Sequence, residues 1–153
     1  MEAMKRILVV SRMTQNCQEA IEAGAQLAEK FSAKLFVMHV VHNPFGLQGW
    51  NLPMVSVEKE YQKLLEQTKH ELEKLVKDVK SKGIDVIEVV RKGDPTDEIL
   101  HMVKDENIDL LITLAHEEWR LEHFLFGRSN EELIRRMPCS VMFVKKEPAA
   151  VEW

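Results

Sequence analysis

The run DLLIT (109–113) followed by LAHEEWRLEHFLFGRSN (114–130) decides how this chain folds and where its function has to be sought. The first segment is short and apolar, which predicts a strand buried on both faces of a parallel sheet. The second leads into a terminal helix, and in many α/β domains such a passage is a glycine loop that binds phosphate. Here its only glycine is Gly127, among bulky, charged and aromatic residues. The passage is therefore either a rebuilt phosphate site or a closed one.

Strands and helices alternate on both sides of this run. The predicted strands are 6–11, 35–41, 85–91, 109–113 and 140–145. Four helices are predicted: a first whose inner face runs from Cys17 to Phe31 and whose start Thr14 or Asn16 could cap, a second at about 57–82, a third that opens at Pro95 with Asp94 as its cap, and a fourth at about 130–137. Apolar residues recur at helical spacing along the first two helices, and these predicted inner faces include Phe31 and Leu64. Glu88, alone among apolar residues in the third strand, indicates the edge of a sheet.

Five parallel strands covered by four helices make a doubly wound α/β sheet. Right-handed crossovers permit the strand order 3-2-1-4-5, in which a ligand crevice lies at the carboxyl ends of strands one and four. Ser11 and Arg12 would line this crevice from strand one, 114–117 from strand four, and 127–130 would form its far wall. We expect one domain, residues 1–146, followed by a tail, residues 147–153.

Composition narrows the classes of function. With 45% hydrophobic and 30% charged residues, the 153-residue chain is an ordinary globular protein. The net charge of -4 argues against a general nucleic-acid binder, and no apolar run reaches the length of about 20 residues that crosses a bilayer. Two cysteines without CxxC spacing give no disulfide framework and no zinc site, so we expect a reduced, cytoplasmic setting.

Single reactive side chains have plain structural interpretations. His39 lies inside an apolar strand and is expected to be a satisfied core histidine, while Cys17 and Cys139 are expected to fill small spaces in the core. His116 and His123 lack a second pair of ligands, so no metal site is expected. No nucleophile has an identifiable base and orienting acid, which gives catalysis no support.

Several motifs together are typical of one known family. They are ILVV at 7–10, HVV at 39–41, GDP at 93–95, DLLI at 109–112 and LFGRSNEELIRRMPCSVMFV at 125–144. In their order and spacing, the chain resembles a universal stress protein domain along almost its whole length. The resemblance implies a Rossmann-like, adenine nucleotide α-hydrolase-like fold and a homodimer paired through strand five.

The resemblance also shows where the nucleotide motif has been lost. ATP-binding members resemble one another in G-x-x-G, nine residues, then G-[S/T]. Carried over by position, the three glycines fall at Leu114, Glu117 and Gly127, and the hydroxyl residue falls at Arg128. Only Gly127 is kept. Glycine lets backbone N–H groups approach phosphate, whereas Leu114 obstructs that approach. Glu117 adds repulsion of roughly 4 kcal/mol per charge pair at about 4 Å and an effective dielectric near 20.

Other family positions have changed as well. The aspartate that usually faces adenosine falls at Arg12, and Asn130 replaces a serine or threonine that often helps to hold phosphate. Val40 matches the apolar residue that commonly lines the adenine slot. Standard binding of MgATP is therefore not expected, and no cofactor is predicted.

Two interpretations of the crevice stay open. Arg12 and Arg128 could hold a phosphate, a carboxylate or a nucleotide such as ATP or AMP through their guanidinium groups. Alternatively, Glu117 or Glu118 pairs with an arginine and the crevice is plugged. Ser129 favours the second interpretation, because Ser129 and Glu132 have the spacing of a capping box that satisfies the helix's own N–H groups.

Apolar residues also crowd the segment 42–56 and the edge strand 140–145, where they either cover their own sheet or form an interface. The residues expected at the dimer edge are Val141, Met142, Phe143 and Val144. We therefore predict a non-catalytic stress-response protein that forms a homodimer, does not bind ATP in the usual way and acts through contacts with an unidentified protein partner. The alternatives are a nucleotide or anion sensor that uses Arg12 and Arg128 and, last, an enzyme of the wider superfamily.

Overall fold

The computed structural model describes residues 3–11, 17–41, 54–114 and 134–145. The elements in chain order are β1 (Arg6–Val10), α1 (Cys17–Phe31), β2 (Lys34–Val41), α2 (Met54–Ser81), β3 (Val86–Lys92), α3 (Pro95–Asp105), β4 (Leu110–Leu114) and β5 (Ser140–Val144). Residues 134–136 are helical, and they are the described part of the predicted fourth helix. None of the helices within the described ranges has the length and apolar character needed to span a membrane.

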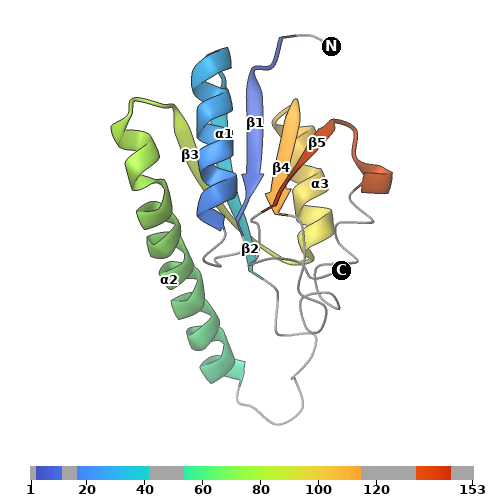
Figure 1. Ribbon diagram of the computed structural model, residues 1–153. Coiled ribbons are helices and arrows are strands. Elements are labelled where there is room, and N and C mark those ends of the chain that lie inside the picture. The colour runs from blue at the N-terminus through green and yellow to red at the C-terminus, as the bar shows by residue number, and fades with distance from the viewer. Residues whose placement is uncertain (1–2, 12–16, 42–53, 115–133, 146–153) are drawn as a thin grey trace, which may run out of the picture.

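The five strands form one parallel sheet in the order β3-β2-β1-β4-β5, which confirms the predicted topology. Helices α1 and α2 cover one face of the sheet and α3 covers the other (Figure 1). On β1, Ile7 and Val9 pack toward α1 and α2, whereas Leu8 and Val10 pack toward α3. Because both faces are covered, the central strands are apolar at every position instead of alternating.

The start of α3 has the predicted capping arrangement. The Asp94 side chain accepts a hydrogen bond from the backbone N–H of Thr96 at 3.0 Å, and Pro95 is the first helical residue. Helix α2 begins at Met54, three residues before the predicted start at Val57. The sequence has Pro53 immediately before it, and proline is compatible with the start of a helix.

Two residues predicted on inner helix faces are exposed instead. Phe31 is 53% exposed at the last position of α1, and Leu64 is 45% exposed. The first turns of α2 run past the carboxyl ends of the strands (Figure 1), and Leu64 belongs to this amino-terminal half of the helix. Helical spacing identified the correct side of each helix but could not show where the sheet beneath it ends.

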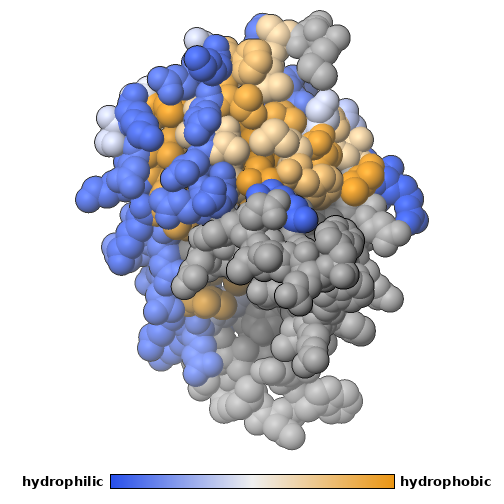
Figure 2. Space-filling view, viewed as in Figure 1, coloured by the Kyte–Doolittle hydropathy of each residue, from blue (hydrophilic) through white to orange (hydrophobic). Residues whose placement is uncertain are grey.

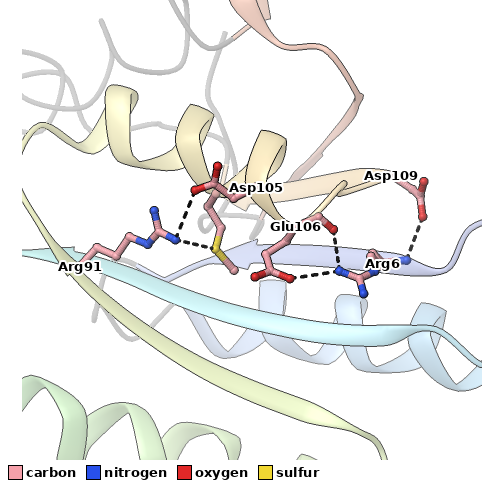
Figure 3. A network of polar contacts seen from close by, with 6 residues as sticks. Arg6, Arg91, Asp105, Glu106 and Asp109 are labelled. Carbon is pink, nitrogen blue, oxygen red and sulfur yellow. Dashed lines mark hydrogen bonds and ion pairs between the residues drawn. The ribbon is translucent and has the colours of Figure 1, made fainter.

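The amino ends of β1 and β4 are joined by Asp109. This residue was predicted to open the fourth strand, but β4 begins at Leu110. The Asp109 carboxylate instead accepts hydrogen bonds from the backbone N–H groups of Lys5 and Arg6 at 2.8 and 2.9 Å. The Arg6 guanidinium donates to Glu106 at its backbone oxygen, 2.8 Å, and at its carboxylate, 3.0 Å (Figure 3). These contacts fix how β1 and β4 lie side by side.

Gly24 brings α1 close to the sheet. A Cβ atom added at this position would lie 2.5 Å from Val9 Cγ2 and 3.1 Å from Leu35 Cδ1, and both of these side chains are fully buried. A larger residue would therefore push the helix away from β1 and β2.

We expect Gly24→Ala to lower the free energy of unfolding by about 1–3 kcal/mol, because overpacking outweighs the gain in helix propensity of about 1 kcal/mol. Chemical denaturation measures this change. Gln26→Ala, at an exposed position of the same helix, serves as the control and should change stability by less than about 0.5 kcal/mol. A Gly24→Ala variant as stable as the parent would show that α1 does not depend on this close approach.

Candidate functional site

The carboxyl ends of β1 and β4 meet at one edge of the sheet. Val9 pairs with Ile112, so Ser11 and Leu114, each two residues further along, lie at the same level of neighbouring strands. In this strand order a crevice is expected here, outside the carboxyl ends. Val40 lies near the same edge, at the penultimate position of β2. The sheet thus brings together the three predicted crevice residues that the structure describes.

The other six predicted crevice residues lie outside the described ranges. They are Arg12, Glu117, Gly127, Arg128, Ser129 and Asn130. The two interpretations that depend on them, an anion site built from arginines and an internal ion pair, therefore stay predictions. The same holds for the capping box of Ser129 and Glu132.

Ser11 is held by two hydrogen bonds from its own backbone to β2, one to a backbone carbonyl and one to a side chain. It is 1% exposed, and its N–H group donates to the Met38 carbonyl oxygen at 2.7 Å. Its own carbonyl oxygen lies 2.7 Å from Nδ1 of His39. The chain therefore leaves β1 from a point at which both its N–H and its C=O are hydrogen-bonded.

His39 is the polar side chain of β2 at this edge. It is half-buried, and its contact with a carbonyl oxygen requires Nδ1 to carry the proton, since a carbonyl can only accept. Burial lowers the pKa of His39 below 6.5, while the hydrogen bond to Ser11 and the charge of Glu71 act in the opposite direction. His39 is thus neutral at pH 7 and its Nδ1 has a partner, which confirms the prediction of a satisfied histidine.

Val40 and Leu114 pack on opposite faces of the sheet. Val40 belongs to the apolar cluster on the side of α3, and Leu114 belongs to the cluster beneath α1 and α2. Leu114 was predicted as the first residue after the strand, but it is the last residue of β4 and pairs with Val144. Its side chain is 6% exposed. The core on this side of the sheet extends to the level of Leu114, so this apolar residue continues the strand by one position.

Strand β5 forms an edge of the described sheet and pairs with β4 alone. Met142 and Val144 pack partly against the cluster beneath α1, and Val141 packs partly against the cluster on the side of α3. Phe143 is 38% exposed. Figure 2 shows hydrophobic surface over β1, β4 and β5 beside α1. The edge therefore carries apolar surface on which a second protein could pack.

A separate groove of about 300 Å³ lies between α1 and α2. Ile21, Leu75 and Val79 supply apolar lining, and the remaining lining residues are Gln18, Glu22, Asp78, Ser81 and Lys82. None of the predicted crevice residues contributes to this groove. Its charges are of both signs, so it has no clear preference for an anion.

The thiols and the possible metal ligands offer little further chemistry in the described residues. Cys17 and Cys139 are both free thiols, and burial raises the pKa of Cys139. Cys139 packs partly in the core on the side of α3, as predicted for a small core residue. Across the described ranges, His, Cys, Asp and Glu do not gather in groups of three or more that could hold a metal ion.

The fold is shared with solved universal stress proteins. The universal stress protein UspA from Lactobacillus plantarum superposes with a TM-score of 0.77 at 17% sequence identity, covering 94% of this chain and 99% of that one. A universal stress protein solved in complex with cAMP gives a TM-score of 0.66 at 18% identity, covering 94% and 98% of the two chains. At these identities the likeness establishes the fold alone.

Sequence comparison extends the likeness to the family. Universal stress protein MJ0577 from Methanocaldococcus jannaschii is 23% identical over 155 aligned positions, which cover 94% of this chain and 96% of that protein. The sequence model of the universal stress protein family matches residues 4–145, which include all five strands. The chain therefore belongs to the universal stress protein family.

Proposed function

We propose that this universal stress protein is a non-catalytic, regulatory member that acts through protein contacts and does not bind ATP in the usual way. The observation that carries this proposal is the position of Leu114. It occupies the place of the first motif glycine, and its side chain is buried in the core at the end of β4. A glycine at this place would leave the backbone open to a phosphate group.

The charge pattern of the sequence supports the same proposal. Carried over by position, Glu117 falls in the place of the second motif glycine, where it would add a negative charge beside the phosphate oxygens. Like charges at such a separation repel by roughly 4 kcal/mol at an effective dielectric near 20, which is enough to abolish ordinary binding. The altered motif thus opposes ATP by shape at Leu114 and by charge at Glu117.

The absence of catalysis is also part of the proposal. A general base needs a free lone pair within hydrogen-bonding reach of the proton that it removes. His39 is the histidine at the described crevice edge, and its Nδ1 proton is donated to Ser11. Nε2 keeps the lone pair of the neutral ring, so the proposal rests on the sequence, in which no nucleophile stands beside an identifiable base and orienting acid.

A nucleotide or anion sensor is the alternative function. The relative solved with cAMP shows that this fold can hold an adenine nucleotide in another member. In this chain, Arg12 and Arg128 would replace backbone N–H groups as the anion ligands. The ligand class would be AMP, ATP or another anion.

We further propose a cytoplasmic homodimer paired through β5. The two free cysteines fit a reducing compartment, and the partly exposed apolar residues of β5 fit an interface between two copies. A second protein partner would then use another surface of the dimer.

Ligand binding separates the two functions. We expect no saturable increase in Tm when ATP, AMP, cyclic AMP or inorganic phosphate is added, because Leu114 and Glu117 oppose an anion in the crevice. A thermal-shift titration measures this effect. A saturable increase with any of these ligands would contradict the main proposal, and its loss in Arg12→Ala would assign the binding to the sensor alternative.

Truncation of Leu114 tests whether its side chain fills the core at this edge. Leu114→Ala should lower the free energy of unfolding by about 2–5 kcal/mol, since the removed atoms leave a cavity under α1. Leu64→Ala removes the same atoms from a side chain that is 45% exposed and should cost under about 1 kcal/mol. Equal losses in the two variants, measured by urea denaturation, would mean that Leu114 does not close the edge.

The proposed dimer is tested at the two edges of the sheet. Phe143 on β5 and Ile87 on β3 are similarly exposed, at 38% and 36%. We expect Phe143→Asp to convert the dimer to a monomer because it buries a charge in the interface, whereas Ile87→Asp leaves the dimer intact. Sedimentation equilibrium measures the mass. A monomeric parent protein, or equal effects of the two substitutions, would rule out pairing through β5.

A further inference from the structure

His39 connects β2 to the end of β1 near the carboxyl edge of the sheet. It belongs to β2, and its ring reaches the last described residue after β1, where Nδ1 lies 2.7 Å from the Ser11 carbonyl oxygen. Its neighbours in sequence show which face it occupies, because Met38 and Val40 pack on the side of α3. The His39 side chain therefore lies on the opposite face, the one that α1 and α2 cover.

The hydrogen bond to Ser11 fixes which nitrogen can take up a proton. Nδ1 already carries hydrogen, because it donates to a carbonyl oxygen, so Nε2 holds the lone pair of the neutral ring. A proton taken from solvent must bind to Nε2 and make the ring an imidazolium. The Nδ1 donor is present in both forms, so what changes is the charge of the ring.

The surroundings of the ring compensate for that charge only in part, because the Ser11 carbonyl oxygen and Glu71 favour the charged ring but burial disfavours it more strongly. Among the described residues, the charged side chain that acts on the ring is Glu71 of α2, which is itself exposed. The neighbour on β3 is Val90, and the neighbour at the end of β1 is the backbone of Ser11. Tyr61 and Cys17, two other titratable side chains buried on this side, are acids and gain no positive charge when the pH falls.

We propose that His39 is a proton-sensitive latch that holds the end of β1 against β2 when neutral and favours an open, hydrated junction when protonated at Nε2. The Ser11 N–H bond to Met38 closes the same junction from the other side, at 2.7 Å. This device lies in the fold itself, so it does not depend on whether the crevice binds a nucleotide.

The sign of the pH effect follows from burial. Burial lowers the pKa of His39 in the folded protein below 6.5, so the open junction binds a proton more readily than the closed one. The stabilising contribution of the neutral ring is therefore present above pH 6.5 and is lost as the pH falls through 6.5 toward the folded pKa. Each pH unit by which the pKa of His39 in the closed junction lies below its pKa in the open junction corresponds to a tenfold change in the opening equilibrium at low pH.

Hydrogen exchange of the Ser11 amide in three proteins tests the latch. His39→Asn keeps an N–H donor near the position of Nδ1 but does not titrate, and His39→Leu has no donor. At about pH 7.5, well above the ordinary histidine pKa, we expect the parent and His39→Asn to protect this amide equally and His39→Leu to protect it several-fold less. At about pH 5.5, below that pKa, protection corrected for intrinsic exchange should fall in the parent and stay unchanged in His39→Asn.

Two outcomes would overturn the proposal. If the parent and His39→Asn respond identically to pH, the junction is not controlled by the protonation of His39. If His39→Leu protects Ser11 as well as His39→Asn does, the ring does not hold the junction.

Nitrogen NMR of the parent protein keeps the proposal testable even if a variant fails to fold. The ring of His39 should appear as the Nδ1–H tautomer and should titrate with a midpoint below 6.5. Glu71→Gln should move this midpoint further down, because the attraction to the carboxylate is lost. An Nε2–H tautomer, or a midpoint at or above 6.5, would contradict the latch.

Discussion

The fold depends on the burial of β1 between two strands and two layers of helices. Every side chain from Ile7 to Val10 is buried, with β2 on one side and β4 on the other. A strand in this position has no face left for water, so its side chains must be apolar and its backbone must be paired along both edges. Gly24 belongs to the same constraint, because it lets α1 settle directly over Val9.

This constraint explains why most of the fold could be predicted from the sequence. Runs such as RILVV and LLITL lack alternation of apolar and polar residues, which predicts strands covered on both faces. Glu88 correctly indicated that β3 is an edge strand. The same lack of alternation explains the error at Leu114. In a strand that is apolar at every position, one more leucine gives no sign of whether the strand has ended. The role of Asp109 was missed because its partners are backbone groups more than 100 residues away in the sequence.

The candidate site was predictable to a smaller extent. The strand order alone places Ser11, Val40 and Leu114 at one edge, so the location followed from topology. The chemistry did not follow, because burial depends on what packs above each position. The size of Leu114 led to the prediction that it obstructs phosphate, which stays a prediction, and its place in the core was not predicted. His39 could be predicted as satisfied, but its partner, the Ser11 carbonyl oxygen, is a backbone group that no sequence pattern marks.

The contacts of Asp109, Arg6 and Glu106 have a consequence for how this family member can diverge. They set the alignment of β1 and β4 at the amino ends of the strands, at the opposite end from the candidate crevice. The residues at the carboxyl ends are therefore not needed to align the two strands. Substitutions can accumulate there while the architecture of the sheet persists.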